Sequence, residues 1–249
     1  MNIYLIKKNN NKRIQKIIHQ YNLKHDKNSS MALIINNDTL ELYDRLHPSQ
    51  KSIKVDFLSK KNNYRCVNSK KKNEILYKAI GIKKNYFPYI IDATAGFGTE
   101  AFLFSFWGCY VVMIERNPII GALLKDGLER AYNSKKIGNW LKKRLHLIFY
   151  DSLDILKKPI LKPDIIYLDP MYPNNKKKTL PKKNMQFLRK IIQDNDNYEN
   201  LLKISRNLVK NRVIVKRPHY AKSLSSKEVS FSISNKKYRF DIYLPYKKK

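Results

Sequence analysis

A chain of 249 residues can hold one large domain and a smaller attached unit, because single cores stop growing near roughly 250 residues. Hydrophobic residues make up 43% of the chain and aromatic residues 12%, which excludes an intrinsically disordered protein. Two cysteines exclude a disulfide framework and argue against structural zinc, and no apolar stretch reaches the roughly 18 residues of a membrane span. We therefore expect a cytoplasmic protein that needs no metal.

The net charge of +31 predicts attraction to polyanions such as nucleic acids. The chain contains 40 Lys but only 11 Arg, together with 25 Asn. Codon drift in an AT-rich genome produces the same surplus of Lys and Asn without selection for binding. The charge therefore supports a nucleic-acid function inferred from other residues and does not establish one.

The sequence pattern of residues 1–68 predicts a small α/β unit. An apolar run over residues 31–35 and a second run over residues 39–43 flank the polar turn at residues 36–38, which is typical of a β-hairpin. A further strand is predicted over residues 52–58. We interpret residues 1–68 as an appended unit and residues 69–249 as the main domain.

The main domain alternates short β-branched runs with helical patterns, which is typical of a parallel sheet covered by helices. The seven predicted strands span residues 89–93, 110–115, 145–150, 165–169, 212–216, 229–234 and 239–244. Only four residues separate the last two strands, so these strands form an antiparallel hairpin at one edge. Asn117-Pro118 predicts the start of the helix after the second strand. The predicted fold class is α/β, with a seven-stranded Rossmann-like sheet.

A glycine turn follows the first of these strands, in the segment from Asp92 to Ala101. Gly96 and Gly98 lie two residues apart there, although the chain has only seven glycines. Glycines at such a turn let the backbone approach a ligand closely. Together with Ala101 they also satisfy the G-x-G-x-x-A fingerprint of dinucleotide-binding enzymes, so a nicotinamide enzyme is a rival interpretation.

Polar residues follow the next two strands at the same edge of the sheet. Glu115 lies about twenty residues beyond the glycines, the spacing at which a carboxylate accepts hydrogen bonds from ribose hydroxyls. The alternative to a ribose contact is a structural role, in which Glu115 is a surface carboxylate that caps the helix beginning at Asn117. Asp151 and Ser152 follow the third strand, and we expect them near the adenine of a nucleoside ligand.

The fourth strand ends in Asp169-Pro170-Met171-Tyr172-Pro173. A carboxylate followed by proline and then by an aromatic ring forms a compact acceptor site for the exocyclic amino group of a base. Tyr172 is predicted to stack on the ring, a contact worth about 1–3 kcal/mol. An ordinary turn after a buried strand is the alternative interpretation of this segment.

These residues resemble the class I S-adenosylmethionine-dependent methyltransferases, whose amino-methylating members carry (Asp/Asn)-Pro-Pro-(Tyr/Phe) where Asp169-Pro-Met-Tyr stands here. Several segments together are similar to the ribosomal small subunit methyltransferase J family: Asp92-Ala-Thr-Ala-Gly-Phe-Gly, Glu115-Arg-Asn-Pro, Tyr167-Leu-Asp-Pro-Met-Tyr-Pro, Val215-Lys-Arg-Pro and Arg239-Phe-Asp-Ile-Tyr. The resemblance covers residues 74–243. It implies methylation of the 2-amino group of a guanine in small-subunit (16S) ribosomal RNA, within an assembled or nearly assembled subunit.

The resemblance and the glycine turn together give a set of candidate site residues. Asp169 and Tyr172 are the predicted catalytic residues. The predicted contacts to S-adenosylmethionine fall on Asp92, Gly96, Gly98, Thr99, Glu100, Glu115, Arg116, Asp151, Ser152 and Asp169. Lysines that follow the base pocket, and the basic pair after the fifth strand, are predicted to bind RNA phosphates: Lys177, Lys182, Lys183, Lys216 and Arg217.

Three other functions fit parts of the sequence. An amino-methyltransferase acting on DNA or on another RNA would use the same sheet and the same Asp169 segment. A non-catalytic RNA-binding assembly factor would retain the fold with a decayed pocket. A nicotinamide dehydrogenase is disfavoured, because no segment is typical of a site for a hydride-transfer substrate.

Overall fold

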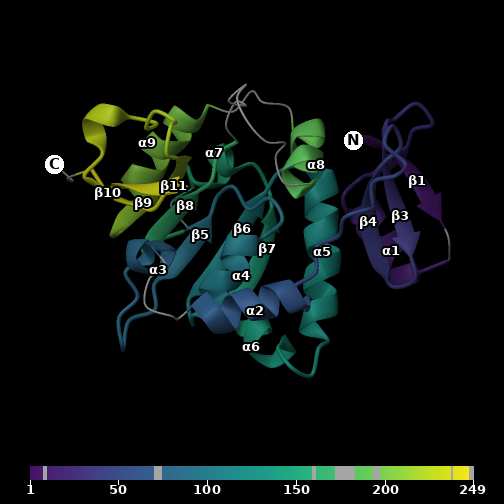
Figure 1. The fold of residues 1–249 in the computed structure, drawn as a ribbon, viewed down its shortest axis with the longest axis horizontal. Helices are drawn as coiled ribbons and strands as arrows, with labels where there is room; N and C mark the ends of the chain where they lie inside the picture. The colour runs from purple at the N-terminus through teal and green to yellow at the C-terminus, as the bar shows by residue number, and fades with distance from the viewer. Residues whose placement is uncertain are drawn as a thin grey trace.

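A large sheet and a small amino-terminal sheet lie on either side of helix α5 (Pro118–Tyr132) (Figure 1). The computed structural model describes residues 1–7, 10–69, 75–158, 161–171, 183–192, 197–236 and 238–246. None of the helices in these ranges is long and apolar enough to cross a membrane.

Seven strands form the large sheet in the order β10-β11-β9-β8-β5-β6-β7. They are β5 (Tyr89–Asp92), β6 (Tyr110–Glu115), β7 (Leu145–Phe149), β8 (Ile165–Leu168), β9 (Arg212–Pro218), β10 (Phe231–Ser234) and β11 (Tyr238–Tyr243). The strands from β9 to β7 run parallel, whereas β11 is antiparallel to both β9 and β10. The seven predicted strands and the hairpin at the sheet edge are therefore confirmed.

Alternate side chains of the parallel strands enter two separate cores, because successive residues of a strand face opposite sides of the sheet. Ile90, Val111 and Tyr167 belong to the core that includes α3 (Ile75–Ile80), α4 (Thr99–Phe106), α5, α6 (Gly138–Arg144) and α8 (Lys183–Ile191). Ile91 and Val112 belong to the second core, which includes α9 (Tyr198–Leu208) and side chains of the short α7 (Ser152–Ile155). A single turn of 3-10 helix, Ser226–Glu228, precedes β10.

Helix α5 begins where the sequence predicts. The side chain of Asn117 accepts hydrogen bonds from the backbone N–H groups of Ile119 at 3.0 Å and Ile120 at 3.2 Å. Pro118 occupies the first helical position, where its missing N–H costs nothing. This cap fixes the point at which the chain leaves the carboxyl end of β6.

The amino-terminal sheet has four strands in the order β2-β1-β3-β4. They are β1 (Asn2–Lys7), β2 (Lys24–His25), β3 (Met31–Asn36) and β4 (Thr39–Asp44), with α1 (Lys12–Gln20) between the first two. The predicted hairpin is confirmed as the antiparallel pair β3 and β4. Helix α2 (Lys60–Ser69) follows and packs against α4.

The prediction of a strand over residues 52–58 is wrong. The segment makes one isolated bridge, in which Ile53 and Leu42 exchange backbone hydrogen bonds of 2.7 and 2.8 Å. Val55 and Phe57 are buried, like Ile53. The alternation that predicted a strand therefore reflects the burial of every second side chain of an extended segment rather than a ladder of hydrogen bonds.

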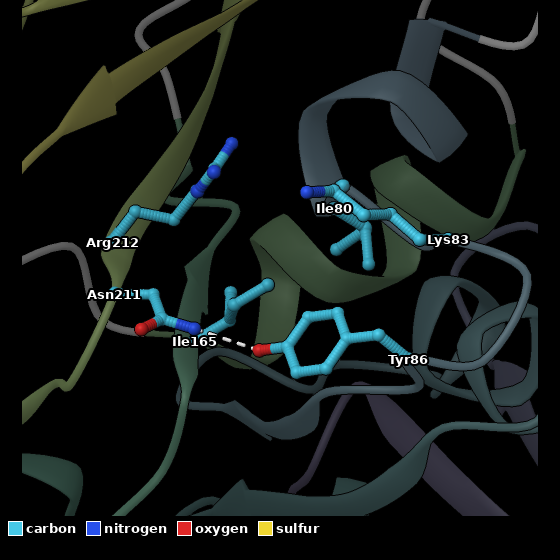
Figure 2. Close-up of a pocket in the computed structure, with 7 residues that line it drawn as sticks. Ile80, Lys83, Tyr86, Ile165, Asn211 and Arg212 are labelled. Atoms are coloured by element: carbon cyan, nitrogen blue, oxygen red, sulfur yellow. Dashed lines mark hydrogen bonds between the residues drawn. The ribbon is translucent and has the colours of Figure 1, made fainter.

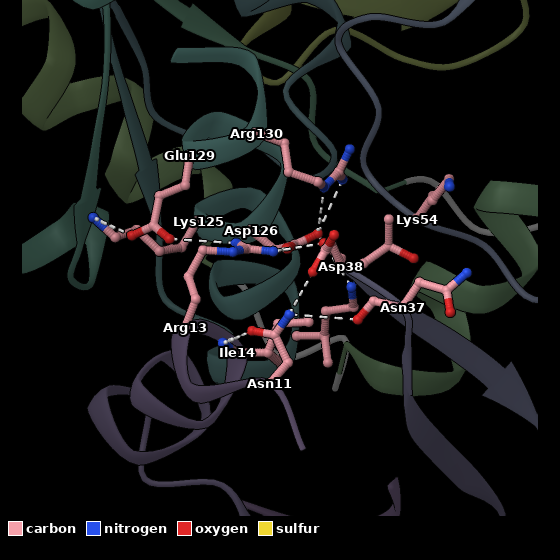
Figure 3. Close-up of polar contacts among 12 residues, drawn as sticks. Asn11, Arg13, Ile14, Asn37, Asp38, Lys54, Lys125, Asp126, Glu129 and Arg130 are labelled. Carbon is pink, nitrogen blue, oxygen red and sulfur yellow. Dashed lines mark hydrogen bonds and ion pairs between the residues drawn. The ribbon is translucent and has the colours of Figure 1, made fainter. Parts of the chain in front are cut away.

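The carboxylate of Asp126 joins the amino-terminal unit to α5 (Figure 3). Asp126 is fully buried and accepts hydrogen bonds from Arg13 at 2.6 Å and from Arg130 at 3.0 Å. The backbone N–H of Leu40, at the start of β4, donates at 3.2 Å to Oδ2 of Asp126, the oxygen that also accepts from Arg130. One buried anion thus holds α1, the β3-β4 hairpin and α5 together.

Replacing Asp126 with alanine should destabilise the protein by about 3 kcal/mol, because two guanidinium groups and one backbone donor lose the buried carboxylate that accepts from all three. Chemical denaturation followed by circular dichroism measures this change. Asp154→Ala is the matched control, since Asp154 forms an exposed pair with Lys157 that is worth less than about 1 kcal/mol. Equal losses of stability in the two variants would contradict the structural role of Asp126.

Candidate active site

The carboxyl ends of three adjacent strands gather the predicted acidic residues. Asp92 ends β5 and Glu115 ends β6, and Asp169 directly follows β8. The chain continues from β5 to β6 on one side and from β8 to β9 on the other, so the strand order reverses between β5 and β8, which is where open α/β sheets bind ligands. A cleft of about 1860 Å³ opens there, and all three carboxylates line it.

The glycine turn between β5 and α4 forms one wall of the cleft. Gly96 and Gly98 have φ values of +52° and +68°, a left-handed conformation that favours glycine. A Cβ on Gly98 would come within 2.9 Å of the sulfur of Met113, whereas a Cβ on Gly96 would meet no atom closer than 3.9 Å. Gly98 is thus required by packing beneath the turn, and Gly96 leaves open space that a ligand can fill.

Glu115 is buried with two backbone partners. Its carboxylate accepts hydrogen bonds from the N–H groups of Gly96 at 3.1 Å and Asn117 at 2.8 Å. Burial raises the pKa of Glu115 to about 7, although these N–H groups oppose the shift. The contact with Asn117 matches the alternative role of Glu115 as a helix cap. A carboxylate has about four acceptor positions, however, so Glu115 can accept hydrogen bonds from further donors such as ribose hydroxyls.

Asp151 and Ser152 are held at the next strand end. Asp151 caps α7 by accepting a hydrogen bond from the N–H of Leu153 at 2.8 Å, and it pairs with Arg116 at 3.1 Å. The hydroxyl of Ser152 donates to the carbonyl of Ala93 at 2.6 Å. These contacts fix the polar groups that follow β7 against those that follow β5 and β6.

Asp169 is held from two sides. Its backbone N–H donates to the hydroxyl of Thr94 at 2.6 Å, and its Oδ2 accepts from Nζ of Lys216 at 2.6 Å. Burial raises the pKa of Asp169, an effect that Lys216 opposes and the charge of Glu100 reinforces. Neither contact was predicted from the sequence, although the place of Thr94 between Asp92 and the glycines was an available signal for the first.

Asp92 carries a buried carboxyl group at the floor of the cleft. It accepts a hydrogen bond from the backbone N–H of Thr94 at 3.2 Å. Burial raises its pKa well above the usual range, and the charges of Glu100, Asp169 and Glu115 add to the shift. These acidic groups together favour a ligand that carries hydroxyl donors and positive charge.

Most of the predicted cofactor residues line this one cleft: Asp92, Gly96, Thr99, Glu100, Glu115, Arg116, Asp151, Ser152 and Asp169. Gly98 does not line the cleft, because its Cα faces the side chains of Met113 and Leu124. Tyr172, Lys177 and Lys182 fall outside the described residues, and so does the side chain of Lys183, whose backbone begins α8. Their predicted roles stay predictions.

The basic pair Lys216 and Arg217, predicted to follow the fifth strand, lies within β9 and makes contacts within the protein. Lys216 reaches Glu100 at 3.3 Å as well as Asp169, and the buried guanidinium group of Arg217 donates to the carbonyl of Lys222 at 2.8 Å. The phosphate contacts predicted for these two residues stay predictions. In the part of the chain that the structure describes, no three His, Cys, Asp or Glu side chains are grouped as a metal site.

A second pocket, of about 350 Å³, lies at the amino ends of β8 and β9 (Figure 2). Ile165 and Arg212 line it, and the side-chain amide of Asn211 donates to the hydroxyl of Tyr86 at 2.7 Å. None of the predicted site residues lines this pocket. The predicted chemistry is thus confined to the carboxyl edge of the sheet.

The strand order, the glycine turn and the acidic residues after β5 and β6 define a class I S-adenosylmethionine-dependent methyltransferase. The family model described as "Putative SAM-dependent methyltransferase" matches residues 16–245. A solved SAM-dependent methyltransferase from Neisseria gonorrhoeae is 27% identical, with a TM-score of 0.79 over 100% of this chain and 98% of that one.

Two curated relatives are named Ribosomal RNA small subunit methyltransferase J. The protein from Buchnera aphidicola subsp. Schizaphis graminum is 67% identical over 100% of both chains. The protein from Photorhabdus laumondii is 42% identical over 94% of both chains. This chain therefore belongs to the ribosomal RNA small subunit methyltransferase J family of SAM-dependent methyltransferases.

The position of Glu115 predicts a pH-dependent affinity for S-adenosylmethionine. Because its pKa is about 7, Glu115 becomes protonated below neutrality and then loses acceptor capacity for hydroxyl donors. Calorimetry should show binding about eightfold weaker at pH 6.0 than at pH 7.5. Glu115→Gln should bind more weakly at pH 7.5 and lose this dependence, and the same slope in both proteins would argue against a ligand contact.

Proposed function

We propose that this protein methylates the exocyclic 2-amino group of a guanine in small-subunit ribosomal RNA. The observation that carries the proposal is the position of Asp169: it follows β8 in the same cleft as Glu115, and proline comes next. The curated relatives are named for the RNA of the small ribosomal subunit, which supports the choice of substrate.

The residues of the cleft fit the cofactor by their chemistry. Glu115 would accept hydrogen bonds from the ribose hydroxyls, and Asp151 and Ser152 would lie near the adenine. The carboxylates of Glu100 and Asp169 suit a ligand with positive charge. When bound, S-adenosylmethionine supplies a methyl group whose bond to sulfur breaks, with its electron pair left on sulfur, as the bond to the amine nitrogen forms.

Asp169 would orient the guanine amine. An ionised carboxylate accepts an N–H of the amine and leaves the nitrogen lone pair free to point into the cleft. Pro170 has no backbone N–H that would compete for the carboxylate. As the new bond forms, the nitrogen gains positive charge and gives up one proton, to Asp169 or to water. Most of the rate enhancement would come from proximity and alignment.

Tyr172 and the lysines that follow it would hold the RNA. Stacking of the guanine on Tyr172 would offset part of the few kcal/mol needed to extrude a base from its stack. We assign residues 1–68 to a separate unit that contacts RNA and residues 69–249 to the methyltransferase domain. The reaction would take place in the cytoplasm, on an assembled or nearly assembled small subunit.

Asp169→Ala should lower kcat at least about 100-fold, because the amine loses its acceptor. Mass spectrometry of small-subunit RNA after incubation with enzyme and cofactor would detect the loss of N2-methylguanine. Asp154→Ala, which removes an exposed carboxylate outside the cleft, should leave the product unchanged. Full turnover by the Asp169 variant would refute the role assigned to Asp169. Methylation of DNA or of another RNA by the wild type, in place of small-subunit RNA, would refute the proposed substrate.

Alanine at both Lys182 and Lys183 should weaken binding to the RNA and flatten its salt dependence. Removing one lysine–phosphate interaction lowers the slope of log affinity against log salt by roughly 0.7 to 0.9. Alanine at both Lys142 and Lys143 is the matched control, since these exposed lysines of α6 carry the same charge away from the cleft. Identical slopes for the two double variants would rule out phosphate contacts at the first pair.

A further inference from the structure

Lys216 lies between two carboxylates at the acceptor end of the cleft. From β9, its Nζ reaches Oδ2 of Asp169 at 2.6 Å and Oε1 of Glu100 at 3.3 Å. Only 24% of its side chain is exposed, and it lines the cleft. An ammonium group has three N–H donors, so these contacts commit most of its hydrogen-bonding capacity.

The groups around Asp169 would repel its negative charge without Lys216. Among the described residues, the charge of Glu100 from α4 raises the pKa of Asp169, the charge of Asp169 in turn raises that of Asp92 on β5, and Lys216 is the cation that contacts Asp169. Arg65 from α2 pairs with Glu100 at 3.6 Å rather than with Asp169. Lys216 thus offsets both the burial of Asp169 and its acidic neighbours.

The two oxygens of Asp169 are used differently. Oδ2 accepts from Lys216, whereas no hydrogen bond to Oδ1 exists within the part of the chain that the structure describes. A carboxylate held through one oxygen keeps a fixed orientation and can present the other oxygen to a substrate donor. Phosphate binding by Lys216 would instead require this ion pair to open.

We propose that Lys216 is the positioning residue of the acceptor site: its ammonium group holds the Asp169 carboxylate ionised and oriented, so that Oδ1 receives the N–H of the guanine amine. The inference rests on the proposed function and assigns Lys216 to the acceptor site rather than to the RNA backbone. The two carboxylates raise the pKa of Lys216 far above its usual value, so it remains a cation throughout the working range.

Lys216→Met keeps most of the side-chain volume and removes the charge. It should lower kcat about 100-fold and change KM for RNA less than about threefold, because the lost function is alignment of the amine. The acid limb of the pH–kcat profile should move upward by at least about one unit, since Asp169 loses the cation that keeps it ionised. Lys216→Arg should restore kcat to within about tenfold and return the limb to its original position.

Glu100→Gln should shift the acid limb of the pH–kcat profile in the opposite direction. The charge of Glu100 raises the pKa of Asp169, so removing it should move the acid limb downward. These profiles are measured at saturating S-adenosylmethionine, because Glu100 is itself a predicted cofactor contact. If Lys216→Met fails to fold in a thermal unfolding assay, Lys216→Arg and Glu100→Gln still test the proposal.

An NMR titration of the Asp169 carboxyl carbon in the ligand-free protein tests the ion pair without any substrate. The proposal predicts a higher pKa of Asp169 in Lys216→Met than in the wild type, and an unchanged value would overturn it. A raised KM and a flattened salt dependence with unchanged kcat would also overturn it, in favour of a phosphate contact. Absence of guanine methylation by the wild type would instead refute the proposed function and leave the titration valid.

Discussion

The accumulation of acidic groups at one edge of the sheet is the constraint on which the site depends. Asp92, Glu115 and Asp169 end or follow neighbouring strands, and Glu100 joins them from the start of α4. Burying these carboxylates is unfavourable unless each finds donors or a cation. The backbone N–H groups of Gly96 and Asn117 donate to Glu115, and Lys216 donates to Asp169. The polar floor is therefore arranged before any ligand binds.

The rest of the fold fixes the walls around this floor. Asn117 caps α5 next to Glu115, and its side-chain amide also donates to the carbonyl of Ile191 at the end of α8 at 3.2 Å. Lys190, also on α8, pairs with the buried carboxylate of Asp44 in the amino-terminal sheet. The amino-terminal unit thus contacts both α5 and α8, and residues of α8 line the cleft. The packing of the amino-terminal unit against these two helices therefore fixes part of the cleft wall and also stabilises the protein.

The sequence predicted the large sheet well because burial on both faces leaves long β-branched runs bounded by clear turns. The start of α5 was also predictable, since Asn117 and Pro118 carry a local capping signal. The segment 52–58 was mispredicted because alternation records burial and not the presence of a paired strand. The Asp169–Lys216 pair was beyond prediction, because it joins a residue that follows β8 to one on β9, 47 positions away, and only the fold determines that these strands are adjacent. Asp126 and Arg13 are separated still further, by 113 positions.

A crystal structure with S-adenosylhomocysteine and a guanosine would test the central claim most directly. The account predicts ribose hydroxyls within hydrogen-bond distance of Glu115, adenine beside Asp151 and Ser152, and the guanine amine on the oxygen of Asp169 that Lys216 leaves free. A nucleoside bound in the pocket at the amino ends of β8 and β9, or a guanine amine that does not contact Asp169, would contradict it.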